Sequence, residues 1–459
     1  MAIALGGFGL FLASIDFAIN VSLPIIRDSF QTNLVNVQWI IIAYHVSRSS
    51  LGFAAGGIAD RFGLRDLFLV GVGFYTIAVG LISLQSELHG VVVLRALQGV
   101  GAGILFTAAP ALVTRAFKPS KRGTALGITL AAVALGQIAG TLGGGWLSSN
   151  LGWESIFWSR VPIGAAIFAI ALIALKPTRP PEVTAVSRTE PINFDWLGAA
   201  MLAVTLLFLL LAIAFARFSG WYSTLPVVLS SLGLLGLVGF MAWELRADRP
   251  IIPAALLRIP EFRAGAISNL LVTIASFVMW FLFPFYVVDV LHRGSVALGT
   301  LLSIMAAAGF AGSVVGGWFA DRIGDRTTTI SGSFILAFGL IWVANLGSGA
   351  FFIVVGASVA LLGLGFGIHQ AAVYALTMRK IPIQHAGSSS AMLAVTQTVG
   401  TVCSITLMTS ILNWRHQTAL GSNGDEISAF ITAFHDTYLI AASVALVAAL
   451  VVVHKFRYR

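Results

Sequence analysis

The feature that most constrains the fold of this chain is a ten-residue motif that occurs twice. The first copy is GGIADRFGLR at residues 56–65, and the second is GWFADRIGDR at residues 317–326. Six of the ten positions are identical, all at one offset of 261 residues, as between Asp60 and Asp321. Each copy lies where a long apolar segment ends and another soon begins. A short polar turn between two apolar helices, repeated once per half, predicts a chain built from two related membrane-embedded halves.

The composition also places the chain in a membrane. Hydrophobic residues make up 58% of the 459 residues and charged residues 10%, whereas soluble domains carry roughly 25% charged residues. The net charge of +9 does not predict a nucleic-acid partner, because the cationic excess lies in short turns between apolar segments, as membrane topology requires. The single cysteine, Cys403, allows no intramolecular disulfide.

Apolar segments recur along the whole chain and are long enough to cross a bilayer core of ~30 Å. The sequence predicts fourteen spans, at residues 2–26, 37–58, 66–86, 90–115, 122–147, 154–175, 195–216, 224–245, 263–290, 296–320, 328–346, 349–378, 387–412 and 429–454.

The distribution of Lys and Arg predicts the orientation of these spans. With Met1 in the cytoplasm, twenty of the 27 cationic residues fall in cytoplasmic turns or the tail, and two fall inside helices. The outer side receives the other five, which are Arg27, Arg160, Arg217, Arg293 and Arg415. Because cytoplasmic loops are enriched in cationic residues, we expect a multi-pass protein of the cell (inner) membrane with both termini cytoplasmic.

The spans group into two bundles and an insertion. Residues 1–175 are expected to form an N-terminal six-helix bundle, 176–194 a Pro-rich cytoplasmic linker, 195–246 an inserted transmembrane hairpin, and 247–459 a C-terminal six-helix bundle. The two motif copies then fall between the second and third helices of their bundles. We therefore expect an all-α polytopic fold of two pseudo-symmetric six-helix bundles plus a two-helix hairpin.

Three motifs together resemble those of a known family. The first span carries DFAINVSLP at residues 16–24, the turn carries GGIADRFGLR at 56–65, and the fourth span carries LRALQGVGAG at 94–103. With these motifs the chain resembles the major facilitator superfamily of transporters over nearly its whole length, and within it the fourteen-helix branch of drug:proton antiporters. The resemblance implies the major facilitator fold and alternating access, with protons and a small molecule as the transported partners. We expect no cofactor, no metal, no nucleic-acid partner, and function as a monomer.

The duplicated turn has a physical interpretation. Glycines let helix ends approach closely, and Gly63 can adopt a positive φ. Asp60 can accept hydrogen bonds from a neighbouring helix end. The resemblance makes the turns a latch that opens and closes as the halves rock; the alternative is a plain turn with cationic anchoring. The expected latch residues are Gly56, Asp60, Arg61, Gly63, Arg65, Gly317, Asp321, Arg322, Gly324 and Arg326.

Glycines in the fifth span predict a close helix contact. Gly136, Gly140 and Gly144 recur at spacing four, which lets two helix backbones touch. The region resembles the family's antiporter motif, which has a proline after the glycine, whereas this chain has Thr141. The departure leaves close packing intact and puts the proline kink, with its link to export direction, in doubt. Plain helix packing is an equal alternative to a functional role.

Charged side chains inside the first bundle predict a polar site, because each costs at least ~2.5–3.5 kcal/mol near the bilayer centre. Asp16 and Arg48 lie ~15 Å deep on consecutive spans. His45 shares a face with Arg48, and Arg95 and Gln98 lie at a spacing of three on the fourth span. Asp16 is the expected proton carrier. If Arg48 pairs with Asp16, the pair is either a structural lock or a switch opened by a proton or an anionic substrate.

The second half offers fewer polar groups. His369 lies in the middle of a glycine-rich span and can titrate or simply fill a hydrogen-bonding position. The expected proton-coupling residues are Asp16, Arg48 and His369. The groups expected to line a substrate cavity are Asn20, His45, Arg48, Arg95, Gln98, Gln137, Asn269, Trp280, Tyr286, Gln370 and Gln397.

Three classes of function compete. The leading hypothesis is a proton-coupled secondary transporter that exports amphipathic small molecules (multidrug-type efflux). A proton-coupled importer or exporter of a specific acidic or zwitterionic metabolite is the alternative, which Arg48 favours modestly. A polytopic membrane enzyme or a transporter-like sensor is the third class. An enzyme would need a nucleophile–base pair or a metal cluster at one membrane face, and the eight histidines show no paired spacing.

Overall fold

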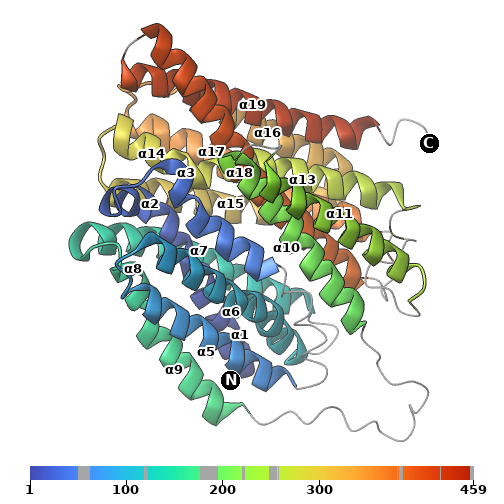
Figure 1. Cartoon of the computed structure of the whole chain (residues 1–459). Helices are drawn as coiled ribbons and strands as arrows, with labels where there is room; N and C mark the ends of the chain where they lie inside the picture. The colour runs from blue at the N-terminus through green and yellow to red at the C-terminus, as the bar shows by residue number, and fades with distance from the viewer. Residues whose placement is uncertain are drawn as a thin grey trace, which may run out of the picture. The chain divides into compact units, whose positions relative to one another are not determined.

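The computed structural model describes residues 1–49, 63–117, 122–175, 195–219, 223–247, 256, 258–379, 381, 386–423 and 425–454. Within these residues all regular secondary structure is helical (Figure 1). This is the expected result for long apolar segments, because a helix satisfies its backbone hydrogen bonds within one segment, where lipid offers no partner. The predicted all-α polytopic fold is confirmed.

The N-terminal half begins with a helix that is interrupted by a short 3₁₀ turn. The elements in chain order are α1 (Ala2–Ser14), the 3₁₀ turn η1 (Ile15–Phe17), α2 (Ala18–Ser29), α3 (Leu34–Val37), α5 (Leu64–Ile82), α6 (Leu88–Arg115), α7 (Arg122–Leu151), α8 (Ser155–Trp158) and α9 (Arg160–Ala174). Residues 39–49 are also helical. The expected linker at 176–194 lies outside the described residues.

A helical hairpin and the C-terminal half follow. These elements are α10 (Trp196–Ser219), α11 (Thr224–Glu244), α13 (Pro260–Phe281), α14 (Phe283–Phe285), the π-helical turn η3 (Tyr286–Val290), α15 (Ser295–Ile323), α16 (Asp325–Ala344), α17 (Phe352–Met378), α18 (Ala386–Asn423) and α19 (Glu426–His454).

Several helix ends follow from local sequence. Asn33 caps α3 by accepting a hydrogen bond from the Asn36 amide at 2.9 Å, as Asn commonly does. Pro260 begins α13, at a position where its missing N–H costs nothing. Gly152, with φ +82°, follows the last residue of α7, which is the usual place for a glycine that stops a helix.

Twelve helices within the described residues are long and apolar enough to cross a membrane. Of the two other expected spans, 37–58 lies partly outside the described residues, and 195–216 corresponds to α10, whose apolar stretch is Ala200–Ile213. The chain is therefore a multi-pass membrane protein, and the count of fourteen spans stays a prediction.

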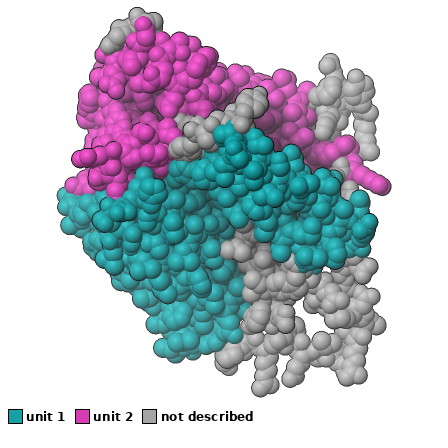
Figure 2. All heavy atoms as spheres, in the orientation of Figure 1, with its two compact units in different colours: residues 1–17, 39–140, 150–251 teal, residues 18–38, 141–149, 252–459 magenta. Residues whose placement is uncertain are grey.

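The chain divides into two compact units (Figure 2). Unit 1 comprises Met1–Phe17, Trp39–Gly140 and Asn150–Ile251; unit 2 comprises Ala18–Gln38, Thr141–Ser149 and Ile252–Arg459. The hairpin of α10 and α11 belongs to unit 1, and short pieces of the N-terminal half belong to unit 2. These units do not coincide with the domain boundaries expected from sequence, which remain a prediction.

The two units repeat one pattern of helix contacts. In unit 1, α1 and α5 each contact both α6 and α9; in unit 2, α13 and α16 each contact both α17 and α19. The offset of the duplicated motif maps the start of α5, Leu64, onto the start of α16, Asp325. Equivalent helices thus have equivalent neighbours, as expected for related halves.

The two motif glycines have the same backbone conformation. Gly63 has φ 90° and ψ 147°, and Gly324 has φ 93° and ψ 147°. This region of backbone space is open essentially only to glycine. Each glycine directly precedes a helix, α5 or α16. The duplicated motif therefore encodes the same turn twice.

An arginine two residues after each glycine donates hydrogen bonds to the C-terminal end of a helix in its own unit, α9 in unit 1 and α19 in unit 2. Arg65 donates to the carbonyl oxygens of Leu175 at 2.7 Å and Leu172 at 3.0 Å, at the end of α9. Arg326 donates to the carbonyl oxygen of Val453 at 2.9 Å, at the end of α19. A guanidinium group at a helix C-terminus satisfies carbonyls that have no helical partner and complements the negative end of the helix dipole.

The glycine stripe of α7 lies against the first span. An added Cβ would lie 2.6 Å from the Phe11 carbonyl oxygen at Gly136 and 2.4 Å from the Ile15 carbonyl oxygen at Gly140. At Gly144 it would lie 2.6 Å from the Cβ of Ala18. The predicted close contact is confirmed, and Gly140 touches the residue that precedes Asp16.

We expect Gly140→Ala to destabilise the protein by at least ~1–3 kcal/mol, because the new methyl group meets backbone atoms that cannot move aside. Gly143→Ala is the matched control on the same helix, since its Cβ would have nothing within 4 Å. Thermal unfolding in detergent compares the two. Equal melting temperatures for the two variants would contradict the contact.

We expect Gly324→Ala to cost ~1–3 kcal/mol through backbone strain alone, because nothing lies within 4 Å of the added Cβ. Gly317→Ala is the control, because its Cβ is equally unhindered but the residue lies inside α15, where alanine is favoured by ~0.5–1 kcal/mol. In thermal unfolding, the melting temperature should fall for Gly324→Ala and rise for Gly317→Ala. A change in the same direction for both variants would argue against the turn conformation.

Candidate functional site

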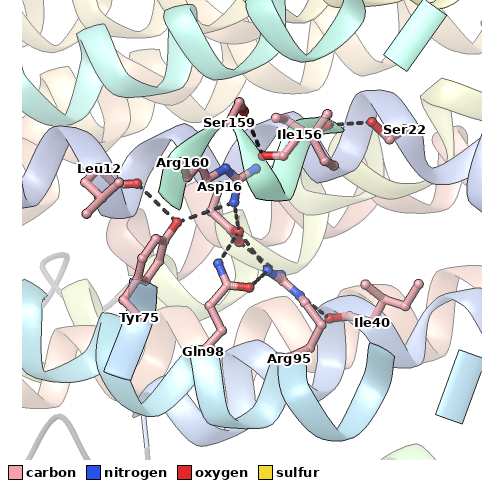
Figure 3. Close-up of polar contacts among 11 residues, drawn as sticks. Leu12, Asp16, Ser22, Ile40, Tyr75, Arg95, Gln98, Ile156, Ser159 and Arg160 are labelled. Atoms are coloured by element: carbon pink, nitrogen blue, oxygen red, sulfur yellow. Dashed lines mark hydrogen bonds and ion pairs between the residues drawn. The ribbon is translucent and has the colours of Figure 1, made fainter. Parts of the chain in front are cut away.

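A buried ion cluster surrounds Asp16 inside unit 1 (Figure 3). Asp16 lies in the 3₁₀ turn η1 and is 5% exposed. Its Oδ1 accepts hydrogen bonds from Arg95 Nη1 and Arg160 Nη1, both at 2.7 Å, and from Gln98 Nε2 at 2.9 Å. Its Oδ2 accepts from Arg95 Nη2 at 2.9 Å. One carboxylate therefore serves two guanidinium groups.

Arg95, from α6, uses all three of its nitrogens. Besides its two bonds to Asp16, Nη1 donates to Gln98 Oε1 at 2.6 Å and Nε donates to the Ile40 carbonyl oxygen at 3.0 Å. The guanidinium carbon also lies 4.3 Å from the centre of the Tyr44 ring, within the range of a cation–π contact. Arg95 is fully buried and fully satisfied.

Arg160, the first residue of α9, is held less completely. Its Nη1 donates to Asp16 and, at 3.4 Å, to the hydroxyl of Tyr75 on α5. That hydroxyl donates in turn to the Leu12 carbonyl oxygen at 3.1 Å. Nε and Nη2 of Arg160 have no hydrogen-bond partner among the described residues, although the side chain is 0% exposed.

The cluster carries one net positive charge, because arginine is always protonated in proteins and a single carboxylate faces two guanidinium groups. Removing one member of a buried ion pair costs about 3–5 kcal/mol, since it leaves an uncompensated charge. The surplus positive charge of this arrangement can attract an anion.

The partners of Asp16 differ from the pair considered from sequence. Arg48 stacks on Phe106, with its guanidinium carbon 3.9 Å from the ring centre, and the ion pairs that the structure shows for Asp16 are with Arg95 and Arg160. His45 is half-buried and packs edge-on against Tyr44. Of the five residues predicted to form one polar cluster (Asp16, His45, Arg48, Arg95 and Gln98), Asp16, Arg95 and Gln98 bond to one another, whereas Arg48 is not the observed counter-ion of Asp16.

The distribution of cationic residues places Arg160 on the outer side of the membrane, which stays a prediction, but it does not predict that Arg160 is a buried partner of Asp16. Its burial and its bond to Asp16 place it inside unit 1. The predicted span 154–175 already held the signal, because its seventh residue lies ~9 Å along the helix at 1.5 Å per residue. Tyr75 was missed as well, although a tyrosine hydroxyl in the middle of an apolar span usually finds a partner.

His369 is the polar centre of unit 2. It lies on α17 and is fully buried. Its Nδ1 lies 2.9 Å from Ser333 Oγ and 3.3 Å from the Thr329 carbonyl oxygen, both on α16. Its Nε2 has no partner among the residues that the structure describes. One ring nitrogen is therefore fixed and the other is left for a proton, water or ligand.

Two expected cavity residues of unit 2 join helices together. Asn269 of α13 donates to Thr396 Oγ1 at 2.7 Å and to the Leu393 carbonyl oxygen at 3.1 Å, both on α18. Tyr286 is fully buried, donates to the Gly347 carbonyl oxygen at 2.8 Å, and stacks on Phe434 with ring centres 4.7 Å apart. The observed contacts of both residues are structural.

The remaining expected cavity residues lie on several helices. Asn20 is buried in α2, whereas the half-buried residues are Gln137 on α7, Trp280 on α13, Gln370 on α17 and Gln397 on α18. The Oε1 atom of Gln370 has no partner within the described part of the chain.

Part of the expected latch lies outside the described residues, namely Gly56, Asp60 and Arg61. Of the second copy, Gly317 is half-buried, and Asp321 and Arg322 are exposed. Arg322 stacks on Trp318, with its guanidinium carbon 4.0 Å from the ring centre. A neighbouring pair that the motif did not predict joins Asp325 to Arg379 at 2.6 Å.

Two carboxylates near helix ends form ion pairs in unit 2. Asp289 accepts two hydrogen bonds from Arg27, at 2.6 and 2.9 Å, and its side chain is 33% exposed. Asp436 pairs with Arg415 and lies 3.1 Å from His435 Nδ1.

Thr141 makes a side-chain hydrogen bond that a proline at the same position could not make. It is fully buried in unit 2, and its hydroxyl lies 2.6 Å from Ser303 Oγ on α15. Its carbonyl oxygen lies 2.4 Å from where a Cβ would stand on Gly299. The residue that replaces the family proline therefore makes a specific polar contact at a close helix crossing.

Groups of three or more His, Cys, Asp or Glu side chains that could hold a metal ion are absent from the residues that the structure describes. The arrangement around Asp16 is a set of ion pairs and hydrogen bonds.

Comparisons with known proteins agree with this geometry. The Major Facilitator Superfamily model matches residues 6–405. The tetracenomycin C resistance and export protein of Streptomyces glaucescens is 28% identical over 358 residues, which are 78% of this chain and 65% of that protein. This chain therefore spans less than two thirds of that relative's length. The riboflavin transporter RibZ of Clostridioides difficile (strain 630) is 25% identical over 457 residues, 98% of this chain and 96% of that protein.

A solved structure shows the same fold. The crystal structure of a bacterial homolog of the human lysosomal transporter Spinster covers 99% of this chain and 97% of its own, with a TM-score of 0.68 and 16% identity. The family match covers most of the chain, the relatives are transporters rather than enzymes, and the two units share one helix arrangement. This chain thus belongs to the Major Facilitator Superfamily and is a multi-pass membrane protein.

Proposed function

We propose that this protein is a proton-coupled transporter that exports amphipathic small molecules by alternating access, as a member of the fourteen-helix drug:proton antiporter branch. The observation that carries the proposal is the buried carboxylate of Asp16 among Arg95, Arg160 and Gln98. A relative with an export function in its name supports the direction of transport. We further propose that the protein works as a monomer in the cell membrane, with both termini cytoplasmic.

Proton coupling is proposed to act through the charge of Asp16. A proton that binds to an Asp16 oxygen neutralises the carboxylate and removes its attraction for Arg95 and Arg160. The net charge of the cluster then rises from one to two positive charges, which is costly in a buried site. The cluster can therefore accept the proton only with a rearrangement of α6 or α9 about η1, and this rearrangement is the step that couples proton binding to a change of conformation.

His369 is proposed as the proton-binding group of unit 2. Its free Nε2 can take a proton while Nδ1 stays anchored to α16. Arg48 is proposed to line the substrate site, because it is half-buried and unlike Arg95 is not among the observed partners of Asp16. The other residues that the sequence predicts to line a cavity, the set that begins with Asn20 and ends with Gln397, complete the proposed substrate site. The duplicated turns are proposed to act as the latch.

The proposal predicts that Asp16→Asn reduces proton-driven transport to the level of protein-free liposomes. The measurement is the movement of ethidium and fluorescein in proteoliposomes under an imposed pH gradient, with internal pyranine reporting proton flux. Asp425→Asn is the matched control, because Asp425 is exposed and its one observed role, accepting from the Ser428 amide, is available to Asn.

The double variant Asp16→Asn/Arg160→Gln separates loss of the proton acceptor from burial of an extra charge, because it restores one net positive charge to the cluster. It should be more stable than Asp16→Asn alone and equally uncoupled. Gradient-driven transport that survives in this double variant would remove Asp16 as the proton carrier. A wild-type protein that moves neither these two dyes nor the monoanionic 1-naphthoic acid under a pH gradient would refute export of amphipathic compounds.

A further inference from the structure

We propose that Arg160 is the anchor for a carboxylate group on the transported molecule, and that the substrates are amphipathic monoanionic acids. This inference rests on the proposed function, because it takes the Asp16 cluster to be part of the transport site. Its basis is the unequal use of the two buried arginines.

Three of the five N–H donors of Arg160, those on Nε and Nη2, have no partner among the described residues. Arginine has five N–H donors arranged as a rigid fork. Arg95 donates hydrogen bonds from all three of its nitrogens, to Asp16, Gln98 and the Ile40 carbonyl oxygen. Arg160 donates hydrogen bonds from Nη1 only. A buried charged donor without a partner costs at least ~1–3 kcal/mol. Such a group calls for a partner that the described residues do not supply.

The geometry of the unused donors specifies the partner. Nε and Nη2 form one edge of the guanidinium group, and both lack a hydrogen-bond partner within the described residues. Their N–H bonds along this edge are parallel, which is the arrangement that receives the two oxygens of a carboxylate. The edge formed by Nε and Nη2 therefore suits a carboxylate and has no partner among the described residues, while Nη1 binds Asp16.

The net charge of the Asp16 cluster favours a ligand with one negative charge. Asp16 neutralises one of the two guanidinium groups, so one positive charge remains, and a monoanion would cancel it. A cationic substrate would meet repulsion at this position, and a dianion such as phosphate would leave an excess negative charge. The ring of Phe157, whose centre is 5.4 Å from the guanidinium carbon of Arg160, gives the same position an apolar side for an amphipathic acid.

A buried water molecule is the competing occupant of this edge, because water commonly satisfies buried polar groups. The two occupants differ in one measurable respect. If water occupies this edge, the binding affinity should not depend on the charge of the ligand. If the edge is the proposed anchor, the protein should bind an acid more tightly than the uncharged amide of the same shape.

The test measures equilibrium binding to the purified full-length protein in detergent, without any gradient. The probes are a panel of amphipathic aromatic acids, among them 1-naphthoic acid, each with its primary amide and its amine. In the wild type at least one acid should bind at least tenfold more tightly than its amide and its amine. Arg160→Gln should abolish this preference. Arg160→Lys should retain part of it, because lysine keeps the charge without the two-pronged fork.

Arg415→Gln is the matched control, because it removes an arginine that pairs with Asp436 in unit 2, and it should keep the full preference. Arg160→Lys preserves the cluster's charge and so remains informative if Arg160→Gln fails to fold. The proposal is overturned if no acid in the panel is preferred by the wild type, or if the preference persists undiminished in both Arg160 variants.

The outcome is separable from that of the proposed function. Gradient-driven dye transport by a wild type that shows no acid preference would retain proton-coupled export and remove the anchor. Acid preference that depends on Arg160, without gradient-driven transport, would retain the anchor and remove the coupling to protons.

Discussion

The ion cluster around Asp16 is the constraint on which the organisation of unit 1 depends. Three spans meet at this carboxylate, through η1, through Arg95 on α6 and through Arg160 on α9. Neither arginine could remain buried without it, because an uncompensated charge in an apolar interior costs several kcal/mol. Tyr75 adds a fourth span, since its hydroxyl joins Arg160 to the backbone of α1. The cluster thus fixes the helices that it joins, and a change in its charge acts on all of them.

Close backbone contacts set where this cluster lies. Gly140 allows α7 to touch the carbonyl of Ile15, immediately before Asp16. In unit 2, Gly332 leaves room for the backbone of His369 in the same manner, with an added Cβ only 2.5 Å from its amide nitrogen. In lipid, helices gain little from the hydrophobic effect on meeting each other, so small residues that permit van der Waals contact decide which faces approach. Each unit therefore brings its main titratable side chain next to a contact that requires glycine.

Sequence reasoning reached the main parts of the site but not its pairing. Asp16, Arg95 and Gln98 could be inferred because each charge or amide lies deep in an apolar span, and depth follows from counting residues along a helix. The pairing could not, because several arginines are available at comparable depth and rotation about each helix axis decides which one reaches the carboxylate. Arg48 stacks on the ring of Phe106, and the arginine that binds Asp16 together with Arg95 is Arg160. Asn269 and Tyr286 likewise proved to hold helices together rather than to stand free.

By itself, the sequence determined that the chain is a polytopic helical membrane protein with two related halves, and it located the turn that each half repeats. Those features depend on composition, on the spacing of apolar runs and on glycine in a backbone conformation closed to other residues, all of which are local properties. Only the tertiary structure decided that Asp16 has two arginine partners, that one edge of Arg160 has no partner among the described residues, and that Arg65 and Arg326 bind the ends of α9 and α19. Ion pairs and hydrogen bonds between helices depend on distances of about 3 Å. These distances are set by helix rotation and by packing between segments that lie far apart in the chain, such as the 79 residues between Asp16 and Arg95 and the 144 between Asp16 and Arg160.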